Sequence, residues 1–328
     1  MRIPASRLRL ALAAGAIVLA LAGASAWWLW GSGSGAGFVE YPMPQRQSMP
    51  IAVAASGDGS VWFTIDGAAA LGRVRDGQLE WLPKPGKSIE PLGLAAAPDG
   101  SVWFTDMAAS AVSRMTPDGE ISSTPINTPM VRLGRLAVAP DGAVWFAEAT
   151  TSSITRIKNG ELTRYQFESA FGGPYGVAVA PDGAVWATLQ AGNQLLRIAR
   201  DGALETFNLP RSRAVPTDVA VAPDGAVWFV EFRGNSIGRF QDGQFVSFTV
   251  AEENAGLSGI AVAADGAVWF GMLRAGSLGR LRDDELETFK LPRADARPYS
   301  VAIDRDGNLW YADIHGYVGM LPADDARE

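Results

Sequence analysis

The sequence offers few side chains that could carry out catalysis. It contains no cysteine and one histidine, His315, which excludes thiolate nucleophiles and metal sites built from several histidines or cysteines. Asp313 precedes this histidine by two residues, and Tyr299 lies a little earlier. These three residues are the candidates for acid–base chemistry, because such chemistry needs a titratable group within reach of the substrate. The alternative interpretation of His315 is an exposed loop histidine.

Four carboxylates share one sequence position, because each stands three residues after a tryptophan. They are candidates for binding a divalent cation or a cationic ligand, since hard cations prefer oxygen ligands. The alternative is that each pairs with a nearby arginine or is solvated, because acids spread so widely along a chain specify no particular metal. The four are Asp106, Glu148, Glu231 and Asp313.

The charge distribution separates a basic N-terminus from an acidic body. The formal net charge is −7. Residues 1–37 contain three arginines and no acid, so the remainder carries about −10. An acidic body disfavours nucleic acid as a partner, because phosphate contacts need a basic surface.

The N-terminus has the pattern of a targeting segment over residues 1–30. A charge-free apolar run, Leu10–Trp30, follows the arginines and is long enough to cross a bilayer, so an uncleaved signal anchor is favoured. Ala24–Ala26 also resembles a signal cleavage site, and cleavage there is the alternative. A Gly/Ser linker over 31–37 then leads to the body, 38–328. The pattern predicts a periplasmic or extracellular body, tethered to the cytoplasmic membrane by residues 10–30.

The body is a sevenfold repeat marked by tryptophan and arginine. Successive copies of the tryptophan are 41 or 42 residues apart, and in six copies an arginine follows eleven residues later. Residues that recur in this way are interpreted as structural, with the tryptophans in the core and the arginines packing between strands. The tryptophans are Trp62, Trp103, Trp145, Trp186, Trp228, Trp269 and Trp310, and the arginines are Arg73, Arg114, Arg156, Arg197, Arg239 and Arg280.

Each unit contains four short strands, as the fifth unit illustrates. A small-residue run, Val219–Ala222, meets a Pro-Asp-Gly turn and then the β-rich run Ala226–Val230. Two further runs follow, Ser236–Phe240 and Gln244–Phe248. Four strands per unit of about 40 residues are typical of a propeller blade, whereas a solenoid would need polar terminal caps that are absent here. The fold is therefore predicted to be all-β: a single seven-bladed β-propeller of four-stranded blades, preceded by the N-terminal transmembrane or signal segment.

The ring is expected to close through the N-terminus of the body. Residues 38–42 resemble the fourth strand of other units, and the last unit stops at Leu321 without one. The early strand is therefore predicted to complete the last blade.

Strand direction predicts where a ligand would bind. The connections into each first strand and the loops after each second strand share one face, here called the open face, and longer variable loops carry binding residues. The four carboxylates are expected on its rim. The residues expected near its axis, predicted to bind a small molecule or a protein, are Tyr175, Thr217, Ser258, Tyr299, Arg135, Asp218 and Arg297.

The repeat also resembles a known family. Segments such as Pro174–Val177, Trp228–Glu231 and Leu204–Pro210 are similar to the repeat of streptogramin (virginiamycin B) lyases, and NHL-type propellers share part of the pattern. The resemblance extends over residues 38–322. It implies the seven-bladed fold, and it implies a family activity in which cyclic depsipeptide antibiotics are opened by Mg²⁺-assisted elimination, with Mg²⁺ as the cofactor.

The residues that the resemblance would make catalytic are replaced. The family's two histidine positions fall on Ser258 and Tyr299, and the glutamate before the second falls on Arg297. The last family glutamate falls on Ile314, or on Asp313 with a one-residue gap. Two hypotheses therefore remain: a ligand- or protein-binding propeller, or a metal-assisted lyase whose rebuilt site uses Asp313, Tyr299 and His315.

Overall fold

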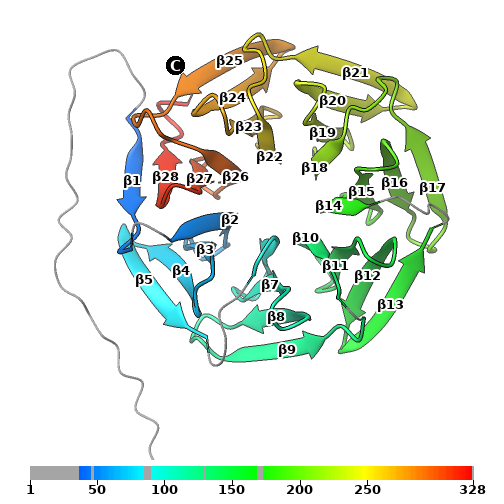
Figure 1. Ribbon diagram of the computed structural model, residues 1–328, viewed down its shortest axis with the longest axis horizontal. Coiled ribbons are helices and arrows are strands. Elements are labelled where there is room, and N and C mark those ends of the chain that lie inside the picture. The colour runs from blue at the N-terminus through cyan, green and yellow to red at the C-terminus, as the bar shows by residue number, and fades with distance from the viewer. Residues whose placement is uncertain (1–36, 46–47, 85–89, 129, 168–172, 327–328) are drawn as a thin grey trace, which may run out of the picture. The chain divides into compact units, whose positions relative to one another are not determined.

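The repeat folds as a ring of blades around a central axis (Figure 1). The computed structural model describes residues 37–45, 48–84, 90–128, 130–167 and 173–326, and these contain seven four-stranded antiparallel sheets. The prediction of an all-β, seven-bladed propeller is therefore confirmed. The signal or anchor segment, 1–30, and nearly all of the linker lie outside the described residues. Within the described ranges, none of the chain forms a helix that could span a bilayer.

The first three blades are consecutive runs of four strands, counted from the axis outward. Blade 1 consists of β2 (Met49–Ala55), β3 (Val61–Asp66), β4 (Ala70–Arg75) and β5 (Gln78–Pro83). Blade 2 consists of β6 (Leu94–Ala96), β7 (Val102–Asp106), β8 (Ala111–Met115) and β9 (Ile121–Pro125). Blade 3 consists of β10 (Leu133–Val138), β11 (Val144–Glu148), β12 (Ser153–Lys158) and β13 (Glu161–Gln166).

The next three blades repeat this order. Blade 4 consists of β14 (Pro174–Val179), β15 (Val185–Leu189), β16 (Gln194–Ile198) and β17 (Leu204–Asn208). Blade 5 consists of β18 (Pro216–Val221), β19 (Val227–Glu231), β20 (Ser236–Gln241) and β21 (Gln244–Thr249). Blade 6 consists of β22 (Leu257–Val262), β23 (Val268–Met272), β24 (Ser277–Arg282) and β25 (Glu285–Lys290).

Blade 7 joins the two ends of the repeat. It consists of β26 (Pro298–Ile303), β27 (Leu309–Asp313), β28 (Tyr317–Leu321) and β1 (Val39–Pro42). The first strand β1 pairs antiparallel with the last strand β28, with Glu40 opposite Gly319. The expected closure by the N-terminal strand is therefore confirmed, and it leaves the ring without an unfinished blade.

The Pro-Asp-Gly turns have the predicted geometry, and the inner strands contain register shifts. In the fifth Pro-Asp-Gly turn, Gly225 has a φ of 88°, and the Asp224 carboxylate accepts a hydrogen bond from the Ala226 amide at 3.0 Å. At its N-terminal end, the inner strand β18 has a register shift relative to β19, between Pro216 and Val219. Neighbouring inner strands crowd there: a Cβ on Gly176 would lie 2.8 Å from the carbonyl oxygen of Thr217.

The repeated tryptophans and arginines pack against each other on neighbouring strands of the same blade. Trp62 is fully buried and lies opposite Arg73 in the β3–β4 register, with the guanidinium 4.8 Å from the ring centroid. The same cation–π contact recurs in blades 3, 5 and 6. The structural interpretation of both repeated residues is confirmed.

Candidate functional site

Two contacts between non-neighbouring blades lie at the positions predicted to bind a ligand. Tyr175 of blade 4 and Tyr299 of blade 7 share a hydrogen bond of 2.8 Å between their hydroxyl groups. Arg135 of blade 3 forms an ion pair with Asp218 of blade 5, with 3.3 Å between Nε and Oδ2. Because each pair joins blades that are not neighbours, these side chains reach across the axial region of the open face.

Burial and nearby charges shift the pKa values of residues in this axial cluster. Burial raises the pKa of Tyr175 well above its usual range, outweighing the opposing effect of the Arg135 charge. Burial alone would lower the pKa of Arg135, but the charge of Asp218 together with Tyr175 and Tyr299 outweighs this effect, and the pKa is raised. The Arg135 guanidinium also lies 5.7 Å from the centre of the Tyr299 ring. Tyr175 therefore stays neutral beside a fixed cation.

The three remaining predicted binding residues differ in how their polar groups are bonded. The Ser258 hydroxyl donates to the Pro298 carbonyl oxygen at 2.8 Å. The Thr217 hydroxyl is buried and has no hydrogen-bond partner among the described residues. Arg297 donates from its guanidinium to the carbonyl oxygen of Ala296 at 2.6 Å. Thr217 and Arg297 thus keep hydrogen-bonding capacity that the protein itself leaves unused.

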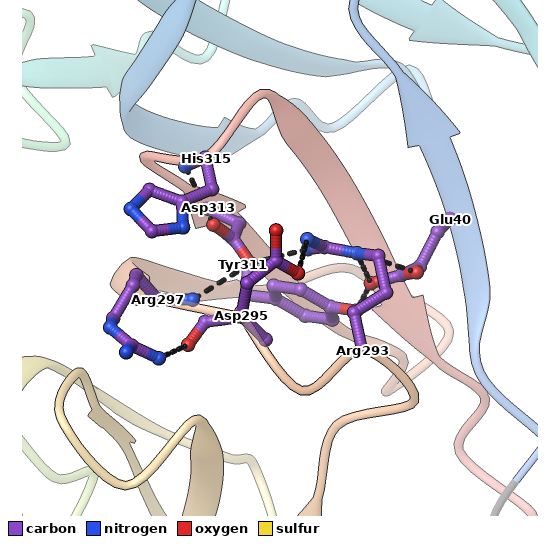
Figure 2. Close-up of polar contacts among 8 residues, drawn as sticks. Glu40, Arg293, Asp295, Arg297, Tyr311, Asp313 and His315 are labelled. Carbon is purple, nitrogen blue, oxygen red and sulfur yellow. Dashed lines mark hydrogen bonds and ion pairs between the residues drawn. The ribbon is translucent and has the colours of Figure 1, made fainter. Parts of the chain in front are cut away.

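Asp313 lies in a different network, which joins blade 7 to the N-terminal strand (Figure 2). Arg293 contacts Asp313 at 2.5 Å and Glu40 at 3.0 Å, and the Tyr311 hydroxyl donates to Glu40 at 2.8 Å. The Asp313 carboxylate also accepts the backbone amides of Arg297 and His315, at 2.9 and 2.8 Å. Asp313 is therefore fully engaged in holding the chain ends together.

The three candidate catalytic residues are not assembled into one constellation. His315 is exposed on the loop after β27, and its backbone amide, not its imidazole, donates the hydrogen bond to Asp313. Figure 2 shows its imidazole beside this network, joined by no dashed contact to the acid. The Tyr299 hydroxyl is bonded to Tyr175 instead. A base oriented by a carboxylate, as a triad requires, is not formed by these side chains.

The four aligned carboxylates are buried, which corrects the expectation that they line an open rim. Each is at most 2% exposed. Asp106 pairs with Lys84 at 3.1 Å, and Glu148 pairs with Arg164 at 3.1 Å and also accepts the Thr155 hydroxyl. A buried carboxylate needs a cationic partner. This partner comes either from the connection that enters the blade, as with Lys84, or from the outermost strand of the blade, as with Arg164.

Glu231 is the least neutralised of the four. It accepts a hydrogen bond from the Ser247 hydroxyl at 3.1 Å, while Arg211 approaches only to 3.7 Å. Burial raises the pKa of the Glu231 carboxyl group, and Ser247 and Arg211 only partly offset this effect. A cavity of about 310 Å³ opens beside it.

A sequence signal for these ion pairs exists in the connections. A Leu-Pro-basic motif ends with Lys84, Arg211 and Arg293. In each case the next blade's second strand ends in an acid, and the two residues pair. Reading the connection together with the following strand would have identified three of the four partners.

The residues present do not fit a Mg²⁺ site of the kind that the resemblance implies. The corresponding positions carry Ser258, Tyr299 and the cationic Arg297, and Asp313 is bound by an arginine and two amides. The four carboxylates belong to four different blades. Across the described ranges, no three acidic or histidine side chains gather closely enough to hold a metal ion.

Comparisons with known proteins agree with this fold. A family model described as the virginiamycin B lyase family matches residues 33–134 and 125–326. A streptogramin B lyase structure superposes with a TM-score of 0.83 at 25% identity, covering 86% of this chain and 96% of that chain. YCF48 bound to D1 peptide gives a TM-score of 0.66 at 15% identity, covering 87% of this chain and 95% of that chain, which shows a shared fold. No curated protein matches the sequence.

A second enzyme structure matches equally well. A catalytically inactive histidine-to-alanine variant of virginiamycin B lyase from Staphylococcus aureus, solved with quinupristin, gives a TM-score of 0.82 at 27% identity. The alignment covers 86% of this chain and 98% of that chain. With the family model matching most of the sequence, the chain belongs to the virginiamycin B lyase family.

Proposed function

We propose that this chain is a binding propeller derived from the lyase fold rather than a working lyase. The strongest support is that serine and tyrosine, both already hydrogen-bonded, occupy the two positions where the family resemblance implies histidine. Ser258 donates its hydroxyl to a backbone carbonyl, and Tyr299 shares its hydroxyl with Tyr175. General base catalysis needs a group that accepts a proton near neutral pH, and a serine hydroxyl that is already bonded does not supply one. The related enzyme solved with quinupristin is inactive when one histidine is replaced.

The proposed ligand site is the open face around the axis. Arg297 keeps unused hydrogen-bonding capacity there, and Tyr175 and Tyr299 add aromatic surface. A small molecule or a protein segment fits this combination of aromatic surface and a few polar groups. We further propose that the propeller works outside the cytoplasm, tethered by the N-terminal segment, because that segment has the pattern of a signal anchor.

A turnover assay tests the proposal. The purified full-length chain is incubated with quinupristin, with Mg²⁺ in one series and EDTA in another. Elimination adds no water, so the opened product has the mass of the substrate and is followed chromatographically. We expect no ring opening above the rate in buffer in either series. Opening that requires Mg²⁺ would overturn the proposal and favour a rebuilt lyase site, with Asp313, Tyr299 and His315 as the first alanine substitutions.

A further inference from the structure

A cavity outside the axial cluster lies at the seam between blades 4 and 5. It has a volume of about 310 Å³, at the lower end of the range for small-molecule sites. Its walls come from the connection after β17, the end of β19 and the outermost strand β21. The lining residues are Pro210, Arg211, Glu231, Phe245, Val246 and Ser247.

The cavity contains an incompletely formed ion pair. Glu231 is 2% exposed, yet Arg211 stays 3.7 Å away, beyond hydrogen-bond distance, with a side chain that is 46% exposed. One guanidinium nitrogen of Arg211 donates to the Gly234 carbonyl at 2.9 Å, which holds the group at the mouth of the cavity. The loop is closed over the acid, because a Cβ on Gly234 would lie 2.8 Å from the Glu231 carboxylate. A cation and an anion therefore both line the cavity, as a loose ion pair without a direct hydrogen bond between them.

Blade 7 shows what the same positions look like when the pair is complete. The Leu-Pro-Arg motif there ends with Arg293, which reaches both Asp313 and Glu40 and is only 17% exposed. Glu40 lies opposite Gly319 in the register of the outermost strand, and Ser247 lies opposite Gly238 in blade 5. The two residues therefore occupy equivalent positions. Serine in place of glutamate removes the second carboxylate that would draw Arg211 inward.

We propose that this seam pocket binds a small zwitterion, an α-amino acid with an apolar side chain. Its ammonium group would bind Glu231, and its carboxylate would bind the fork of donors on Arg211. Its side chain would lie against Phe245, which shares a face of β21 with Ser247. This assignment matches both charges of the pocket, whereas a simple amine or a simple acid would leave one of them opposed.

Three probes test the assignment on the full-length chain. L-Leucine, leucinamide and N-acetyl-leucine share one side chain, but leucinamide lacks the carboxylate and N-acetyl-leucine lacks the ammonium group. Affinities are measured by saturation-transfer NMR titration. We expect L-leucine to bind more tightly than either analogue by on the order of tenfold, the value of one charged hydrogen bond. Equal binding of leucinamide, or no saturable binding of L-leucine, would overturn the proposal.

A matched pair of variants locates the site. Ser247→Glu introduces the carboxylate of blade 7 and is expected to draw Arg211 inward, weakening L-leucine binding by on the order of tenfold. Thr288→Glu adds the same charge at the equivalent exposed register position of blade 6, where the second strand ends in Met272, and should leave binding unchanged. Unchanged binding in Ser247→Glu, or an equal loss in both variants, would show that the ligand binds elsewhere. Melting temperatures of both variants confirm that each is folded.

Discussion

Blades 5 and 7 carry the same local motif and use it differently. Each is preceded by Leu-Pro-Arg, and the second strand of each ends in a buried acid. In blade 7 the arginine side chain is 17% exposed and bridges two carboxylates, whereas in blade 5 it is 46% exposed and stands 3.7 Å from its acid. One outer-strand residue, Glu40 in one blade and Ser247 in the other, accounts for the difference. A repeat position can thus change from a structural bridge to an available charge by a single substitution.

The complete bridge lies where the ring has to close. Strand β1 is the only strand of blade 7 that comes from the other end of the repeat, and Arg293 connects its Glu40 to Asp313. The guanidinium also lies 3.5 Å from the centre of the Tyr317 ring. Burial alone would lower the pKa of Arg293, but its bonds to Glu40 and the charge of Asp313 outweigh this and the pKa is raised. The cation is therefore fixed at the closing seam.

Removing the arginine should give the largest difference in stability loss between the two blades. Arg293→Ala leaves two carboxylates beside each other without their cation, and we expect a loss of about 3–5 kcal/mol in the free energy of unfolding. Arg211→Ala removes a half-exposed and loosely paired arginine, so the loss should be about 1 kcal/mol or less. Urea unfolding followed by tryptophan fluorescence measures both. Equal losses would mean that the contacts in blade 5 are as strong as those in blade 7.

Replacing Glu40 of blade 7 with the serine found at the equivalent position of blade 5 should have an intermediate effect on the free energy of unfolding. Glu40→Ser removes the acceptor of the Tyr311 hydroxyl and one of the two carboxylates on Arg293. We expect a loss of about 1.5–3 kcal/mol, the cost of hydrogen bonds to a charged group, by the same unfolding measurement. Glu40→Gln keeps an oxygen acceptor for Tyr311 and serves as the control, with a smaller loss. If glutamine costs as much as serine, the charge of Glu40 matters and its hydrogen bonds do not.

The fold could be predicted from the sequence because its signals are local and repeated. The spacing of tryptophans such as Trp228 and Trp269 fixes the number of blades, and the turn residues fix the strands between them. The closure followed from a missing fourth strand after Leu321. Each of these inferences needs only the order of residues along the chain.

The site could be predicted only in part, because it depends on contacts between blades. Strand direction correctly placed Glu231 and Asp313 at the ends of their strands, but it could not show that neighbouring segments bury them. Tyr175 and Tyr299 are 124 residues apart, and nothing local indicates that their hydroxyl groups meet across the axis. Such distances are set by the closed ring, and they appear only when all seven blades are in place.

The smallest effect in the comparison is the pH dependence of Glu231. Burial raises the pKa of this carboxyl group in the folded state above its ordinary value, so the folded protein retains a proton that the unfolded chain has released. Its contribution to stability therefore decreases as the pH rises from the unfolded pKa to the folded pKa. Glu231→Gln keeps the shape of the protonated acid. We expect the variant to match the parent below this window and to be more stable above it.

Urea unfolding between about pH 4 and pH 7 measures this difference, since ordinary glutamate titrates near the lower limit. Glu148→Gln is the control, because Glu148 has a closer arginine and the Thr155 hydroxyl. There the substitution removes a paired charge and should lower stability at neutral pH. If Glu231→Gln behaves in the same way, Arg211 neutralises Glu231 in solution, and the seam pocket has no spare charges for a zwitterion. Opposite signs at neutral pH would show that the repeat contains one completed and one uncompleted ion pair.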